Sequence, residues 1–88
     1  MNENPNKNQF TTNFYLAAFL SAKGLNLIGI DRSDSQRSKF QFEKSPQWSR
    51  LIEAFNFAKE DSPEVLIDAR KLILAIKSLK EKLYQNRI

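Results

Sequence analysis

Apolar positions are densest near the start of the chain, where residues 12–24 read T-N-F-Y-L-A-A-F-L-S-A-K-G. Thr12 or Asn13 suits a helix N-cap, because a short side-chain oxygen accepts from the unpaired N–H groups of the first turn. Gly24 suits the left-handed residue that ends many helices. We therefore predict a helix between these signals. Because it is apolar nearly all round, it needs cover from its own chain or from a second subunit.

Two shorter stretches after this helix have the patterns of β-strands. Residues 25–32 (L-N-L-I-G-I-D-R) carry Leu and Ile on both faces, which predicts a strand covered on both sides. Residues 38–44 (S-K-F-Q-F-E-K) alternate, so that Phe40 and Phe42 point to one face and polar residues to the other. The turn formers S-D-S-Q lie between them, and together the two strands predict a β-hairpin. Phe10 and Thr11 are interpreted as a short extended entry.

The second half of the chain predicts two amphipathic helices. Ser45 and Pro46 indicate a helix start, with Ser as the cap and Pro at the first position. The apolar face of this helix follows i, i+3, i+4, i+7 spacing at Trp48, Leu51, Ile52, Phe55 and Ala58. The last helix is predicted to run to about Gln85, with an apolar stripe at Leu72, Ile76, Leu79 and Leu83.

Residues 63–67 allow two interpretations. Ser62 and Pro63 could begin one long helix that continues to the end of the chain. Alternatively, V-L-I at residues 65–67 is a brief extended segment, and Asp68 caps a helix that begins after it. We favour the second interpretation, because V-L-I favours extended structure and Asp is a good N-cap.

Together these elements predict a single α+β domain over residues 10–88: helix, β-hairpin, helix, short extended segment and long helix. Residues 1–9 are polar and Asn-rich, and we predict a disordered N-terminal tail. The predicted core consists of Phe14, Leu16, Phe19, Leu20, Leu27, Ile28, Ile30, Phe40, Phe42, Trp48, Leu51, Ile52, Phe55, Leu72, Ile76 and Leu79.

The composition of the chain excludes several classes of catalytic and metal-binding site. The 88-residue chain has no cysteine and no histidine, which excludes disulfide frameworks, zinc sites built on those residues, and Ser–His–Asp or Cys–His catalysis. We predict a protein that is not an enzyme and that has no catalytic residues, no cofactor and no metal. No stretch resembles a signal peptide or a membrane span, so we expect a cytoplasmic protein without a membrane partner.

Charge supplies the leading functional hypothesis. The formal net charge of +4 is concentrated at the end of the chain, since residues 68–88 alone sum to +4. A basic helix together with the hairpin could follow the phosphate backbone of DNA or RNA. The candidate residues are Arg70, Lys71, Lys77, Lys80, Lys82, Arg87, Arg37 and Lys39. The plainer interpretation is that Lys and Arg occupy the solvated face of a helix and suit its C-terminal end.

The alternative function is a homodimeric interaction or assembly subunit that binds no nucleic acid, either alone or within a larger protein complex. It is motivated by the first helix, whose apolar surface would suit a second subunit. The candidate interface residues are Phe14, Tyr15 and Phe19.

Two further patterns have functional and structural interpretations. Phe40 and Phe42 beside basic residues are reminiscent of sheets that stack bases, but their alternation with polar neighbours favours a place in the core. Asp31, Asp34 and Glu43 could gather a cation such as Mg²⁺. However, the two aspartates lie in or beside a turn, where Asp commonly accepts from its own backbone.

The chain also resembles a family of short, uncharacterised bacterial and phage-type domains of unknown function. The resemblance rests on F-Y-L-A-A-F-L-x-A-x-G at residues 14–24, a strand ending in Asp31-Arg32, F-x-F-E at residues 40–43, Ser45-Pro46, and a last helix with Leu79-Lys80. It covers most of residues 10–85 and implies a stand-alone α/β domain. It implies no activity, substrate or catalytic residue.

Overall fold

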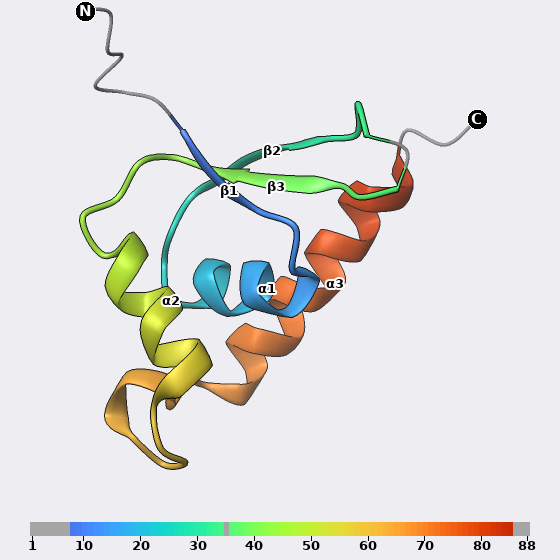
Figure 1. The fold of residues 1–88 in the computed structure, drawn as a ribbon. Helices are drawn as coiled ribbons and strands as arrows, with labels where there is room; N and C mark the ends of the chain where they lie inside the picture. Colours follow the sequence, from blue (N-terminus) through green and yellow to red (C-terminus); the bar gives the residue numbers. More distant parts are fainter. Residues whose placement is uncertain (1–7, 35, 86–88) are drawn as a thin grey trace, which may run out of the picture.

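The computed structural model describes residues 8–34 and 36–85, which form a three-stranded antiparallel sheet with helices packed on one face (Figure 1). The predicted α+β class and the order helix, hairpin, helix, helix are confirmed. The elements are β1 (Gln9–Thr11), α1 (Phe14–Ala22), β2 (Leu27–Asp31), β3 (Lys39–Phe42), α2 (Trp48–Phe57), a 3₁₀ turn η1 (Pro63–Val65) and α3 (Ala69–Gln85).

Helix α1 begins and ends at the residues that the sequence predicts. The Asn13 side-chain oxygen accepts from the N–H of Leu16 at 3.1 Å, which caps the first turn. Gly24 has a φ of +103°, in the left-handed region. Its N–H donates to the carbonyl of Ser21, and the N–H of Leu25 donates to that of Leu20, which is the Schellman arrangement.

The sheet has one strand more than predicted. Its strand order is β1-β3-β2. Strand β1 pairs with β3 on the side away from β2, and Phe10 lies opposite Gln41. A run of three residues is too short for its alternation to identify it as a strand. Of the predicted tail, residues 1–7 lie outside the described residues, and Gln9 is the first residue of β1.

The prediction that the strand after Gly24 is covered on both sides is wrong. Ile28, assigned to the core, is 49% exposed. The register between β2 and β3 shifts between Leu27 and Gly29, which is a β-bulge at Ile28. Because β2 is an edge strand and the helices cover one face of the sheet, only the side chains paired with Phe40 and Phe42 face the core.

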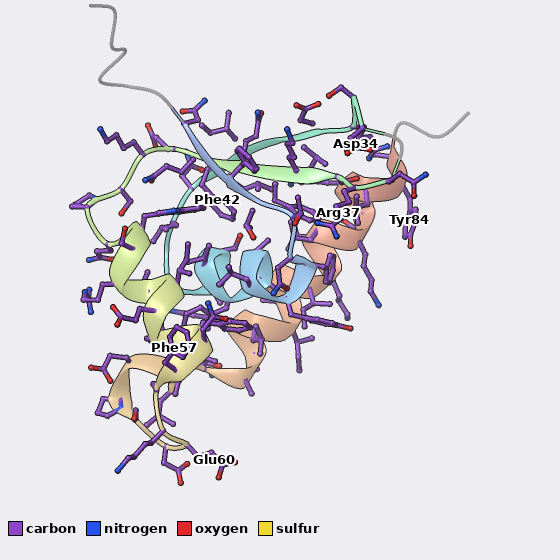
Figure 2. All side chains as sticks on the ribbon, viewed as in Figure 1. Asp34, Arg37, Phe42, Phe57, Glu60 and Tyr84 are labelled. Atoms are coloured by element: carbon purple, nitrogen blue, oxygen red, sulfur yellow. The ribbon has the colours of Figure 1, made fainter. Side chains whose placement is uncertain are left out.

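The core lies between the sheet and the helices. Phe40 and Phe42 are 2% and 0% exposed, and Figure 2 shows Phe42 between the two layers. Their predicted place in the core is confirmed. The other buried apolar side chains are Leu16, Ala17, Ala18, Phe19, Leu20, Leu25, Leu51 and Leu79. The remaining predicted core residues, apart from Ile28, pack half-buried around this cluster. Helix α1 is therefore covered by its own chain.

The segment before α3 combines parts of both interpretations. Residues 63–65 form η1, Leu66 is extended with φ −73° and ψ 138°, and α3 begins at Ala69. The Asp68 carboxylate accepts from the N–H of Arg70 at 2.8 Å, so the predicted cap is confirmed. Helix α2 begins two residues later than the predicted first position, although the Ser45 hydroxyl accepts from the N–H of Gln47.

Candidate functional site

The basic side chains of α3 are exposed and lie on both sides of its apolar stripe. Residues spaced by seven or eleven positions nearly eclipse each other on a helix. Arg70 and Lys77 therefore share one flank, with Lys80 beside them, and Lys71 and Lys82 share the other flank. All five side chains are exposed to solvent. Within the described residues, α3 thus carries two basic strips rather than one. Arg87 lies outside the described residues.

These cations have few neighbouring anions. Within α3 the acidic residue is Glu81, against five Lys and Arg residues. Arg70 lies 3.7 Å from Asp68, but the two side chains are 88% and 43% exposed, so the pair contributes little to stability. Lys82 Nζ donates to the hydroxyl of Ser78 at 3.3 Å, which leaves its charge unneutralised. The helix surface therefore keeps most of its positive charge.

The cations of the hairpin lie in different places. Arg37 is exposed in the loop before β3, and together with Leu83 it lines a cavity at the C-terminal end of α3. Figure 2 shows Asp34, Arg37 and Tyr84 at this end of the molecule. Lys39 instead lies on the outer face of the sheet, with Nζ 4.8 Å from the centre of the Phe10 ring. Arg37 can thus extend the surface of α3, whereas Lys39 cannot.

Arg32, at the end of the hairpin's first strand, has a structural contact. Its Nη2 atom donates to the backbone carbonyl of Lys82 at 2.6 Å and also to that of Leu83. These carbonyls belong to the last turn of α3, where the helix dipole is negative and intrahelical donors run out. The guanidinium therefore joins the hairpin to the end of α3.

The carboxylates near the hairpin accept hydrogen bonds from neighbouring groups. Asp31 accepts from the N–H of Ser33 at 2.9 Å and Asp34 from that of Gln36 at 2.8 Å. The bond from Ser33 is the main cause of a lowered pKa of Asp31. Glu43 accepts from Asn26 Nδ2 at 3.1 Å. Within residues 8–34 and 36–85, no three acidic side chains gather closely enough to hold a metal ion.

An apolar groove that the sequence did not predict runs between α1, α2 and α3. It has a volume of about 360 Å³. Tyr15 and Phe19 of α1 line one side, Leu72 and Ile76 of α3 the other, and its remaining lining residues are Phe55, Ala58, Lys59, Glu60, Val65 and Ile67. The residues come from four separate segments, so no local pattern identifies the groove. We call it the helix groove.

The predicted dimer residues have different environments around this groove. Phe19 is 5% exposed and its ring lies 5.2 Å from that of Phe55, in the chain's own core. Phe14 is half-buried against Phe40. Tyr15 is 66% exposed. Of the three, Tyr15 is the side chain that a partner could reach without opening the fold.

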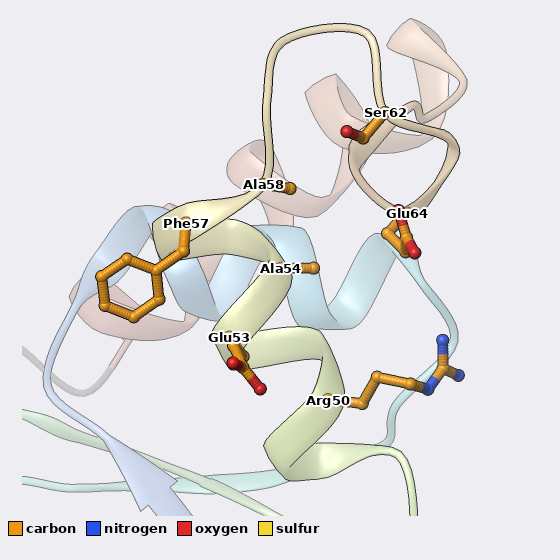
Figure 3. Close-up of a pocket in the computed structure, with 7 residues that line it drawn as sticks. All are labelled: Arg50, Glu53, Ala54, Phe57, Ala58, Ser62 and Glu64. Atoms are coloured by element: carbon orange, nitrogen blue, oxygen red, sulfur yellow. The ribbon is translucent and has the colours of Figure 1, made fainter.

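A second cavity, of about 370 Å³, lies beside the C-terminal half of α2 (Figure 3). Figure 3 shows Arg50 and Glu64 directed toward each other across its mouth, while the Phe57 ring points away. Phe57 is 79% exposed. The lining is a mixture of small, apolar and oppositely charged side chains, which indicates no particular ligand.

No helix in the part of the chain that the structure describes has the length and apolar character needed to cross a membrane.

Residues 6–85 match the model of the family described as Domain of unknown function (DUF5659), and the chain therefore belongs to that family. This match confirms the resemblance to a small domain of unknown function. Comparison with curated proteins and with solved structures gives no match.

Proposed function

We propose that this member of the DUF5659 family is a non-catalytic module that binds the phosphate backbone of DNA or RNA through α3. The observation that carries the proposal is the exposure of five basic side chains on a helix whose acidic residue is Glu81. Neutralising a phosphate with Lys or Arg releases condensed counterions, and this release favours binding without sequence readout.

The dimensions of α3 also suit a polyanion. Arg70 and Lys80, on the same flank, lie ten residues apart, which is about 15 Å along a helix. Arg37 adds a cation at the C-terminal end of the same helix. Because nucleic acid is available in the cytoplasm, the proposal includes a cytoplasmic location. The bacterial or phage source that the sequence resemblance implies is likewise part of the proposal.

The test is a fluorescence-anisotropy titration with single-stranded DNA, duplex DNA and RNA of matched length, over a series of salt concentrations. The double variant Lys77→Gln/Lys80→Gln removes two charges from one flank of α3. Each lost phosphate contact should flatten the plot of log affinity against log salt by about 0.7 to 0.9. We therefore expect the slope to decrease by roughly 1.5 in the double variant.

The matched control is Lys44→Gln/Arg50→Gln, which removes the same charge from sites outside α3. It should leave the slope close to that of the unchanged protein. Absence of binding at low salt to all three nucleic acids would exclude the proposed function. Equal slopes for the two double variants would exclude α3 as the binding surface. Its basic side chains would then be the ordinary solvent-exposed residues of a helix.

A homodimeric assembly subunit remains the second candidate function. The sequence suggested this function through the apolar surface of α1. The structure buries most of that surface within the chain, so the surface no longer supports a dimer. The observation in its favour is now Tyr15, an exposed aromatic side chain beside an apolar groove.

A further inference from the structure

We infer that the helix groove holds an unstacked base of a single-stranded nucleic acid, with Tyr15 as its stacking partner. The inference rests on the proposed function and adds to it the class of substrate. It starts from two features that lie side by side: an apolar groove with an exposed aromatic ring, and the basic flank of α3.

Tyr15 is held in place by other aromatic rings. The Phe14 ring lies 5.3 Å from the Tyr15 ring at an interplanar angle of 88°, so the two rings make a T-shaped contact. Phe14 in turn contacts the buried Phe40 at 5.9 Å. An exposed aromatic ring that a second ring already holds in place can stack on a flat ligand at little cost in side-chain entropy.

The basic flank adjoins the groove because of helix spacing. Ile76 lines the groove, and residues three and four positions away are its neighbours on the helix surface. On the basic flank these neighbours are Ile73, which is 52% exposed, and Lys80. Lys77 and Arg70 follow on the same flank. The other charged residues that line the groove are Lys59 and Glu60, whose charges cancel. The positive charge therefore lies on the α3 side.

The helix groove is apolar and lies beside cations. It therefore suits a flat ligand that has apolar faces and a negatively charged group attached at its side. A nucleotide unit has this form, with its base in the groove and its phosphate at Lys80 or Lys77. The cations continue along α3 beyond the groove, as a chain of phosphates requires. A base paired in a duplex cannot enter, whereas a single strand can turn a base outward. The apolar lining offers few groups that read base edges, so any base should be accepted.

The test compares Tyr15→Ala with Tyr15→Phe in the anisotropy titration, using a single strand of DNA and a duplex of matched length. Stacking on one aromatic ring is worth about 1–3 kcal/mol. Affinity for the single strand should therefore fall roughly 5- to 150-fold in Tyr15→Ala. It should change less than about twofold in Tyr15→Phe, which keeps the ring. Duplex affinity and the salt slope should not change in either variant.

Phe57→Ala is the matched control, because Phe57 is also an exposed aromatic side chain but lies outside the groove. It should leave single-strand affinity unchanged. Equal affinity of Tyr15→Ala and the unchanged protein for the single strand would overturn the inference, as would equally tight binding of duplex. Either of these two outcomes overturns only the role of Tyr15. The proposed function still stands if the Lys77→Gln/Lys80→Gln variant flattens the salt slope. Absence of all binding would remove both.

Two other occupants would also overturn the inference. If light scattering shows a dimer that Tyr15→Ala dissociates, the groove belongs to a second copy of the chain. A peptide rich in Glu and Leu could bind more tightly than the single strand and lose its affinity in Tyr15→Ala. That result would assign the groove to an acidic partner protein.

Discussion

Arg32 is the first residue after β2. Its guanidinium contacts the last turn of α3, fifty residues later in the chain. A planar group with several donors can satisfy two carbonyls at once. Both carbonyls lie in the last turn of α3, at the negative end of the helix dipole. One side chain thereby joins the hairpin to the C-terminal end of α3.

We predict that Arg32→Ala destabilises the fold by about 1–3 kcal/mol, because it removes hydrogen bonds from a charged donor. Urea denaturation followed by circular dichroism measures the change. Arg37→Ala is the control, since Arg37 lies in the same loop with its side chain exposed, and it should change the free energy of unfolding by less than about 0.5 kcal/mol. Equal effects of the two substitutions would mean that the contact with α3 contributes nothing.

Single residues were predicted well where their chemistry is local. Asp68 caps the helix that follows it, and Asp31 and Asp34 accept from backbone N–H groups two residues on. These roles depend only on a short side chain and its immediate neighbours. The role of Arg32 could not be predicted, because its partners are brought near by the fold. In the sequence, Arg32 is only the residue after Asp31 at the end of a predicted strand.

The end of α1 shows how one element is terminated. After Ala22 the chain turns through Gly24, and the hydrogen bonds of Gly24 and Leu25 close the last turn. Leu25 is 9% exposed, so the turn also carries an apolar side chain back into the core. The hydrophobic contact and the left-handed glycine together direct the chain toward β2.

We predict that Gly24→Ala destabilises the fold by about 1–2 kcal/mol, the cost of a left-handed conformation for a residue with a Cβ atom. Contact with other parts of the fold does not cause this cost, since a Cβ atom at Gly24 would meet nothing within 4 Å apart from its own chain neighbours. Thermal unfolding should therefore show a lower midpoint for this variant.

Gly29→Ala is the control for that substitution. A Cβ atom there also meets nothing within 4 Å, and Gly29 does not have a positive φ. This substitution should leave the midpoint unchanged or slightly higher, because alanine has less conformational entropy to lose on folding. If both variants lost the same stability, backbone strain would not be the reason.

At the scale of elements, start and stop signals predicted α1, and periodicity predicted the hairpin and the two amphipathic helices, but periodicity failed for β1 and for the outer face of β2. Whether an apolar strand is covered on both faces depends on where the helices pack, which the strand itself does not encode. Ile28 therefore looked like a core residue and is exposed. For the same reason the sequence yielded the basic residues of the site but not the helix groove.

The molecule as a whole is a two-layer structure in which β3 is the central strand and β1 and β2 are the edges (Figure 1). Strand β3 has neighbours on both sides, and its two phenylalanines are buried. Strand β1 has three residues, a single neighbouring strand and an exposed Phe10. The stability of the sheet should therefore decrease from its centre to β1.

We predict that backbone amides bonded within α1 and between β2 and β3 exchange with solvent only when the whole domain unfolds. Those that bond β1 to β3 should exchange faster, through local opening of the edge. Hydrogen exchange followed by NMR measures the two rates under native conditions. If the β1 amides were as protected as those of α1, the edge strand would belong to the same cooperative unit as the core.

The position of β3 and α3 in the chain has a consequence for synthesis. Helix α1 leaves the ribosome early, yet the residues that cover it come later: Phe40 and Phe42 in β3, Leu51 in α2 and Leu79 in α3. Strand β1 likewise precedes its partner β3 in the chain. During translation the apolar segment of α1 therefore stays partly uncovered until α3 has been made. A nascent chain with this order of elements depends on rapid completion or on chaperones to avoid aggregation.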